Sequence, residues 1–269
     1  MEVDSSQVNV AKYIIKKTPI GHLGKGLENL KILLGEKVMD NKDVKKEIHN
    51  YGENHLSPVQ NDITNTKVVV SALTKDADGY YYDQGQKVRF KIGLDNGTIE
   101  GAEAIEYKNE LRDKVQEKLL QYLDKYYKAE ATKYNVYFNE AQNKMVVIIS
   151  AHNLNLKAFW TGEWLSTWEL TLNDKKVHGQ VRTNTYYYEE GNIQLNLDQK
   201  FDQTISGDTP TSLIEFIEKC ENDVQTAMEK VYETFNENYI KPLRRALPVT
   251  GTKMNWDVNQ AQIVTREGQ

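Results

Sequence analysis

Apolar residues recur at helical spacing along the first part of the chain. Within residues 5–50 they repeat every three or four positions, which is typical of amphipathic helices. One stripe ends at Pro19 and a second, made of leucines, ends at Gly35. Residues 41–49 predict a third, weaker helix. Because these segments and their connections are short, we expect a small antiparallel helical unit.

After residue 50 the sequence becomes more polar, and the spacing of its apolar residues changes from the helical period. Residues 51–65 contain Gly52 and Pro58 among polar residues, so we expect a loop there. Residues 68–70 and 88–92 predict short strands. A helix with one apolar face is predicted from about 104 to 127.

Strict alternation of apolar and polar positions dominates residues 133–200. The pattern predicts five strands, and their short connections favour antiparallel pairing because parallel strands need long crossovers. Residues 145–150 are apolar throughout, which indicates a strand buried on both faces. Trp164, Trp168 and Leu170 are expected to share one face of the following strand.

A long helix is predicted from residue 212 to 240. Its apolar residues alternate between spacings of four and three, as in a long packed helix, and they are Leu213, Ile217, Cys220, Val224, Ala227, Val231 and Phe235. Residues 212–215 fit a capping box, and Pro242 ends the helical pattern. Such a helix can lie across the five-stranded sheet and bury one face, which makes the fold class α+β.

A five-stranded meander has two open edges. Long exposed edges invite aggregation, and proteins normally cover or pair them. The apolar stripe of the long helix is also wider than one face of this sheet requires. Both features favour a partner chain that continues the sheet.

Charge is unevenly distributed over the 269 residues. The whole chain carries −5, whereas residues 241–269 carry +3 and the remainder −8. A basic tail on an acidic body suggests an acidic partner, although a solvated, disordered end is an equal alternative. The acidic balance argues against a nucleic-acid binder, and no apolar run is long enough for a membrane span. Residues 1–4 do not resemble a secretory signal, and the single Cys220 excludes an internal disulfide, so we expect a reducing, cytoplasmic location.

Patterns that carry chemistry are missing from the sequence. The five histidines show no metal-ligand spacing, and no nucleophile elbow is present. The glycine-rich residues 21–26 lack the order of a phosphate-binding loop, and Cys220 falls on the apolar stripe of the long helix. The aromatic residues of 159–168 are expected to be core. We therefore expect no enzyme activity, no cofactor and no metal.

Ordered motifs nevertheless resemble those of a known family. Residues 241–256 read KPLRRALPVTGTKMNW, residues 159–168 read FWTGEWLSTW, and residues 187–195 read YYEEGNIQL. Near the N-terminal end, residues 56–59 read LSPV. Together they are similar to α subunits of F-actin capping protein, and the similarity covers nearly the whole chain.

The resemblance implies a particular arrangement of the α+β fold. It predicts a three-helix stalk (1–52), a small central globule with a helix (53–131), a five-stranded antiparallel sheet (132–200), one long helix across it (201–240) and a mobile basic C-terminal tentacle (241–269). In this family, α and β subunits have similar folds and join their sheets into one of ten strands. The expected partner is therefore a capping protein β subunit, in a heterodimer, or a second copy of this chain, in a homodimer.

The resemblance also implies a function and site residues. It predicts binding to the barbed end of actin filaments in the cytoplasm, where the chain blocks addition and loss of subunits. The residues implied in actin contact are Lys241, Arg244, Arg245, Lys253, Trp256, Ile263 and Val264. Lys241, Arg244 and Arg245 are also implied in binding phosphoinositide lipids.

Two departures from the family pattern weaken the expected tail contact. Gly251 replaces a residue that is basic in typical members, and the apolar stripe after Trp256 is thin. An alternative is a divergent interaction module of the same fold, acting mainly through phosphoinositides or other protein partners.

Overall fold

The computed structural model describes residues 4–19, 21–93, 98–155, 157, 159–187, 193–235 and 237–238. The chain divides into two compact units, Met1–Cys220 and Glu221–Gln269. Every described strand belongs to the first unit, and helix α6 (Thr209–Phe235) contributes to both.

Four helices form the N-terminal part of the first unit. They are α1 (Ser5–Lys17), α2 (Leu23–Leu34), the one-turn α3 (Glu36–Met39) and α4 (Lys42–Asn54). Side chains of Asp4 and Asn41 accept hydrogen bonds from the backbone of the first turns of α1 and α4, which explains where these helices begin. Their common core consists of Val8, Ala11, Ile15, Leu30, Val38, Val44, Ile48 and Tyr51.

A small globule follows the helices. It contains the hairpin β1 (Pro58–Asn61) and β2 (Thr66–Val69), the short helix η1 (Ala72–Thr74), and the three-stranded sheet β3 (Tyr81–Asp83), β4 (Val88–Ile92) and β5 (Ile99–Ala104). The predicted loop over 51–65 is wrong at its start and in its middle, whereas residues 62–65 form a turn as expected. Helix α4 continues to Asn54 because Tyr51 is buried and donates its hydroxyl to the backbone oxygen of Thr18 (3.1 Å), and β1 forms by pairing with β2.

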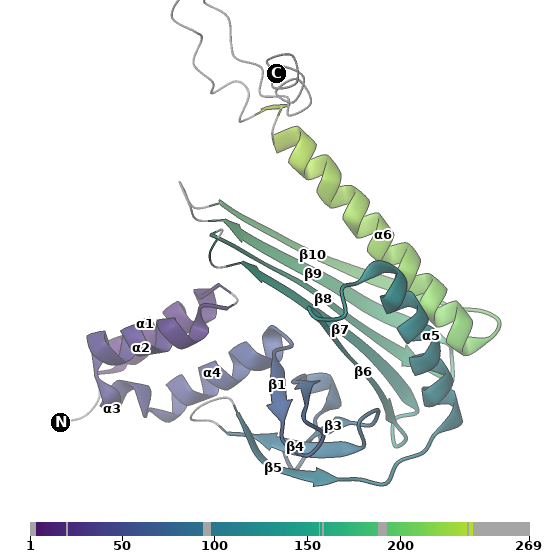
Figure 1. Ribbon diagram of the computed structural model, residues 1–269, viewed down its shortest axis with the longest axis horizontal. Helices are drawn as coiled ribbons and strands as arrows, with labels where there is room; N and C mark the ends of the chain where they lie inside the picture. The colour runs from purple at the N-terminus through teal and green to yellow at the C-terminus, as the bar shows by residue number, and fades with distance from the viewer. Residues whose placement is uncertain are drawn as a thin grey trace, which may run out of the picture. The chain divides into compact units, whose positions relative to one another are not determined.

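The centre of the unit is a five-stranded antiparallel meander, as predicted. Its strands lie in the order β10-β9-β8-β7-β6, and their bounds are β6 (Thr132–Asn139), β7 (Lys144–Asn155), β8 (Trp160–Thr171), β9 (Lys176–Tyr187) and β10 (Ile193–Thr204). Figure 1 shows the five strands side by side. In the register of the sheet, Val147 lies opposite both Val136 and Trp168. Residues 145–150 are all buried, which confirms a strand covered on both faces.

Helix α5 (Glu110–Tyr126) and the start of α6 lie beside each other (Figure 1). Glu218 of α6 joins them, because it accepts hydrogen bonds from Lys125 (3.2 Å) and from the hydroxyl of Tyr126 (2.5 Å). The predicted start of α6 at Ser212 is wrong. Asp208 is the cap instead: its backbone oxygen accepts from the amide of Ser212 and its carboxylate from Thr211, and Pro210 is tolerated in the first turn.

The sheet is packed on both faces. On one face, Trp168 of β8 contacts Phe216 of α6 edge-on, with ring centroids 5.7 Å apart. On the other face, Leu56 and Val69 pack against Val146, Ile148 and Leu165. Because α4 leads directly to Leu56, this second cluster joins the helical region and the globule to the sheet.

Candidate functional site

Strand β10 forms one edge of the sheet and has no strand paired to its outer side within the described residues. Ile205 donates its backbone N–H to the oxygen of Lys175 on the β9 side (2.9 Å). Hydrogen-bonded positions alternate along an antiparallel pair, so the odd-numbered residues of β10 bond to β9. The backbone groups of the even-numbered residues, such as Asp198 and Lys200, therefore face outward toward the open edge. The oxygen of Lys200 accepts only a long hydrogen bond from the side-chain amide of Gln199 (3.4 Å), which a further strand can replace.

The two faces of β10 differ in character. Phe201 stacks on Trp168 with centroids 5.8 Å apart, and Leu195 and Leu197 alternate with it on the same face. The opposite face is polar and exposed. There Asp198 accepts a hydrogen bond from Gln180 (2.8 Å), and Asp202 pairs with His178 on β9.

The edge formed by β6 is partly covered by side chains. Gln84 donates its amide N–H to the backbone oxygen of Phe138 (2.9 Å) and accepts the backbone N–H of the same residue (2.7 Å). Arg112 donates Nε to the backbone oxygen of Val136 (3.0 Å). These contacts occupy both backbone groups of Phe138 and the oxygen of Val136, so the outward side of β6 is partly covered. Among the described strands of this sheet, β10 is therefore the more open template for a further strand.

A buried polar cluster fixes α4 and its C-terminal end to the sheet. The carboxylate of Glu163 is fully buried and accepts from His55 Nδ1, at 2.8 and 2.9 Å from its two oxygens. Asn184 on β9 also donates to Glu163, and His152 Nε2 lies 3.8 Å away. Burial lowers the pKa of His152, against the raising effect of Glu163. A buried carboxylate held by two strands and one helix end fixes their relative positions.

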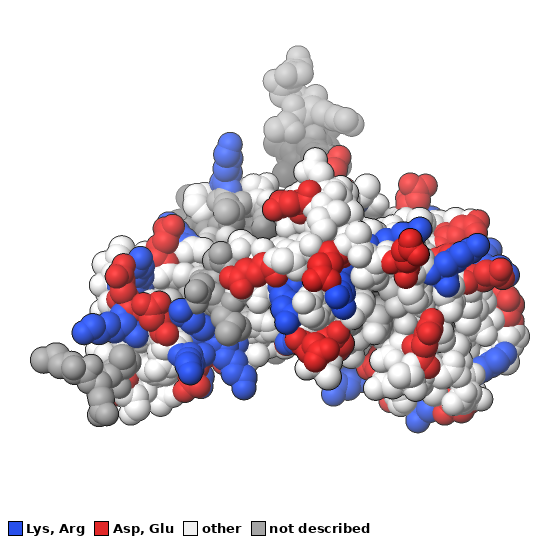
Figure 2. Space-filling view, turned by 90° about the horizontal axis from the view of Figure 1, so that it is seen from below, with Lys and Arg blue, Asp and Glu red and all other residues white. Residues whose placement is uncertain are grey.

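Charged side chains of both signs cover the face of the molecule seen in Figure 2, with basic and acidic groups interspersed. Among the described residues, no group of His, Cys, Asp and Glu is arranged to hold a metal, and no helix has the length and apolar character that a membrane crossing requires. Cys220 is buried.

The predicted contact residues of the tail cannot be placed. Lys241, Arg244, Arg245, Lys253, Trp256, Ile263 and Val264 all lie outside the described residues. Sequence reasoning anticipated an open sheet edge but did not identify which one, and it missed Gln84 and the cluster around Glu163. The polar alternation of β10 was the signal available for the edge.

Comparisons with known proteins agree with this architecture. Residues 11–266 match the model of the F-actin capping protein alpha subunit family, so the match includes all seven predicted tail residues. The F-actin-capping protein subunit alpha of Caenorhabditis elegans is 28% identical over 287 residues, covering 98% of both chains. That of Gibberella zeae is 25% identical over 264 residues, covering 94% of this chain and 93% of the relative.

A solved structure has the same fold. The homodimeric actin capping protein alpha subunit from Plasmodium berghei superposes with a TM-score of 0.75 at 19% identity, covering 91% of this chain and 98% of that one. The family match, the five-stranded meander and its crossing helix lead to one conclusion: the chain belongs to the F-actin capping protein alpha subunit family.

Proposed function

We propose that this chain caps the barbed ends of actin filaments in the cytoplasm, as one subunit of a dimer that shares a single sheet. The observation that carries the proposal is the family match, which extends from residue 11 through the basic tail to residue 266. The free β10 edge supports the dimer. Capping requires binding only and no catalysis.

The tail is the proposed actin contact. Lys241, Arg244, Arg245 and Lys253 would attract the acidic surface of actin and set its orientation. Trp256, Ile263 and Val264 would then fill an apolar cleft on the terminal subunit. A filament end held in this way can neither add nor lose subunits.

A second copy of this chain fits the β10 edge. Two-fold antiparallel pairing about Gln199 sets Asp198 of each copy opposite Lys200 of the other, and Leu197 opposite Phe201. A shift of one residue in the two-fold centre sets two copies of Asp198, or two of Lys200, against each other. The charges on β10 therefore favour the register about Gln199, and the related Plasmodium berghei protein is itself described as a homodimer.

Exposed apolar side chains on α1 and α2 offer a second contact area for the same partner. They are Val10, Tyr13, Ile14, Ile32 and Leu33, of which Ile32 is 82% exposed. The connection between α1 and α2 lies near the outer strands, since the ring of His22 is 6.5 Å from that of Tyr186 on β9. Exposed apolar side chains gathered on neighbouring helices mark interaction sites.

Phosphoinositides are proposed as regulators through the same charges. Lys241, Arg244 and Arg245 would bind anionic headgroups, so lipid and actin would compete for the tail.

The test combines light scattering with seeded elongation of actin on one purified sample. A mass of twice 31.0 kDa with slowed barbed-end elongation supports a homodimeric capper. A monomer that becomes active only with a β subunit supports the heterodimer. A stable dimer that never slows elongation contradicts capping and favours a divergent interaction module.

Variants then test the tail. Lys241→Ala with Arg245→Ala should reduce capping and binding to phosphoinositide vesicles, whereas Lys42→Ala with Lys46→Ala, at exposed positions of α4, removes the same charge as a control. Unchanged capping by the tail variant would contradict the proposed contact.

A further inference from the structure

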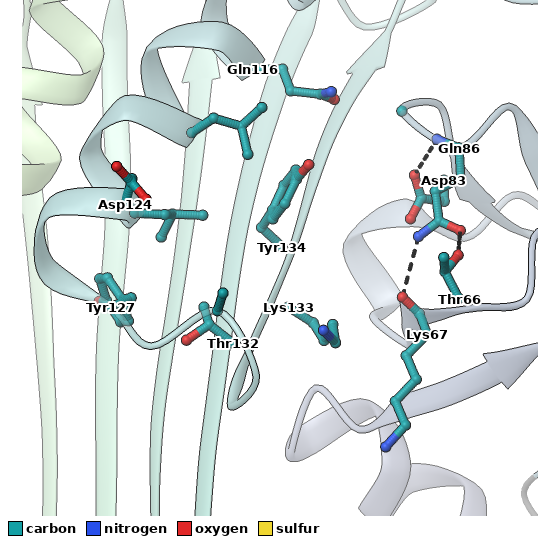
Figure 3. Close-up of a pocket in the computed structure, with 14 residues that line it drawn as sticks. Thr66, Lys67, Asp83, Gln86, Gln116, Asp124, Tyr127, Thr132, Lys133 and Tyr134 are labelled. Atoms are coloured by element: carbon teal, nitrogen blue, oxygen red, sulfur yellow. Dashed lines mark hydrogen bonds between the residues drawn. The ribbon is translucent and has the colours of Figure 1, made fainter.

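A cavity separates the globule from α5 and the start of β6. Its volume is about 370 Å³, and Figure 3 shows side chains entering it from both sides. On the globule side lie β2 and the turn after β3, and on the other side lie α5 and β6. Ligand pockets typically measure about 300–1,000 Å³, so this cavity suits a small ligand or one side chain.

Asp83 is the unusual feature of the cavity. Its side chain lines the cavity although the residue is only 3% exposed. Oδ1 accepts the backbone N–H of Gln86 (2.9 Å), but Oδ2 is buried and makes no hydrogen bond to any residue that the structure describes. Burial raises the pKa of Asp83. A buried carboxylate oxygen without a donor is costly, and each such group in a native protein calls for an explanation.

The positively charged Arg112 influences Asp83 but donates its hydrogen bonds to other groups. Arg112 lowers the pKa of Asp83 through its charge, yet its nitrogens donate to Val136, Asp113 and Gln116. Gly85 packs closely against the ends of Arg112 and Gln116, and the lack of a side chain there permits this close approach. A Cβ at this position would lie 2.6 Å from Gln116 Oε1 and 2.7 Å from Arg112 Nη2.

The loop that holds Asp83 is itself fixed. The Gln86 amide donates to the backbone oxygen of Lys67 (3.2 Å) and accepts from Thr66 (2.5 Å), as the dashed lines in Figure 3 show. The acceptor at the inner end of the cavity is therefore preorganised, which reduces the entropy cost of binding.

The remaining wall is largely apolar and aromatic. It is formed by Leu120, Leu123, Tyr127 and Tyr134. The rest of the lining consists of Gln116, Asp124, Ala129, Thr132 and two lysines. The ammonium group of Lys67 points away from Asp83 in Figure 3. Because the nearby charges offset one another, recognition here depends on hydrogen bonding and on the apolar wall more than on net charge.

We propose that this cavity binds a guanidinium group carried on an apolar stem, with Asp83 as its acceptor. The backbone N–H groups of Gln86 and Gly85 already stabilise the carboxylate, so Oδ2 is the oxygen left to accept from the guanidinium. The methylene stem packs on the leucines, and the guanidinium plane can stack on a tyrosine ring, which an ammonium group does less well. The group belongs either to an arginine side chain of a partner polypeptide or to a small free guanidine.

The test is a titration of the full-length protein followed by amide NMR shifts. The probe is N-acetyl-arginine methylamide, with the matching citrulline and lysine derivatives as isosteric and cationic controls. Saturable shifts at Gly85, Gln86 and Leu123 with the arginine probe alone are expected. An arginine tripeptide that binds more tightly than agmatine indicates a polypeptide source, and the reverse indicates a free guanidine. No saturable shift, or equal binding of the lysine derivative, overturns the proposal.

Variants separate the site from its surroundings. Asp83→Asn should weaken the arginine probe by about tenfold or more, because it removes a charge-assisted hydrogen bond. Asp78→Asn, at an exposed turn of the same globule, should leave binding unchanged. If Asp83→Asn unfolds the protein, Leu120→Trp is the second variant. Leu120 on α5 is 41% exposed, so a larger side chain there can fill the cavity and should abolish the NMR shifts. Equal binding by wild type and a folded variant of either kind contradicts the site.

Discussion

Gly179 on β9 lies directly against the indole ring of Trp168 on β8. A Cβ at this position would lie 2.1 Å from Cζ3 and 2.2 Å from Cε3 of that ring. Trp168 is fully buried and also contacts Phe201 and Phe216, so the ring has no free space to move into. Glycine at residue 179 therefore leaves the room that Trp168 needs to pack against α6.

Gly179→Ala should lower the free energy of unfolding by about 3 kcal/mol, because the added methyl group displaces the indole from a packed core. Urea unfolding followed by tryptophan fluorescence measures this change. Gly162→Ala on β8 is the matched control, since its nearest atoms lie at an ordinary 3.8 Å. Equal stability of the two variants would contradict the packing argument.

Gln84→Leu should destabilise the protein by about 2–4 kcal/mol, because it leaves both the N–H and the oxygen of Phe138 without a partner. The loss of this cover on the edge should also increase aggregation, which dynamic light scattering detects. Gln142→Leu, at an exposed position in the neighbouring hairpin turn, is the control and should change neither quantity. A Gln84 variant as stable and as monodisperse as the control would show that β6 needs no such cover.

The free energy of unfolding should fall as the pH decreases through 6.5, the ordinary pKa of histidine. Burial holds the pKa of His152 below that value, so the unfolded state takes up a proton there that the folded state does not. From about pH 7.5 to about pH 5.5, wild type should lose up to about 1 kcal/mol more than His152→Gln. His178→Gln, whose imidazole is half exposed, serves as the control. Identical pH dependence in wild type and His152→Gln would exclude this histidine as the cause.

Lys200→Asp should weaken self-association by about tenfold if two copies pair about Gln199. In each of the two symmetry-related pairs, the new aspartate then lies opposite Asp198 of the other copy. Adding Asp198→Lys reverses both charges and should restore much of the affinity. Sedimentation equilibrium measures the dissociation constant, and Lys176→Asp on β9 changes the same charge away from the β10 edge. Wild-type association of the single variant would rule out this register.

Much of the fold could be predicted because its elements have regular local patterns. The meander, the buried strand at Met145 and the long helix followed from periods of two and of three to four residues. The start of α6 was misplaced because Asp208 and Ser212 are both acceptable caps, and only the hydrogen bonds distinguish them. The strand at Pro58 could not be foreseen, since its formation depends on pairing with β2.

The sequence by itself determined the family, the five strands and the basic tail, because ordered motifs, alternation and charge are properties of the chain. Only the tertiary structure decided that β6 is partly covered and β10 is open, since Gln84 and Arg112 reach β6 across long sequence separations. The same holds for the Asp83 cavity and for Glu163, which His55 contacts from 108 residues away. Such sites form where segments that are distant in the sequence come into contact, and no local sequence pattern specifies that contact.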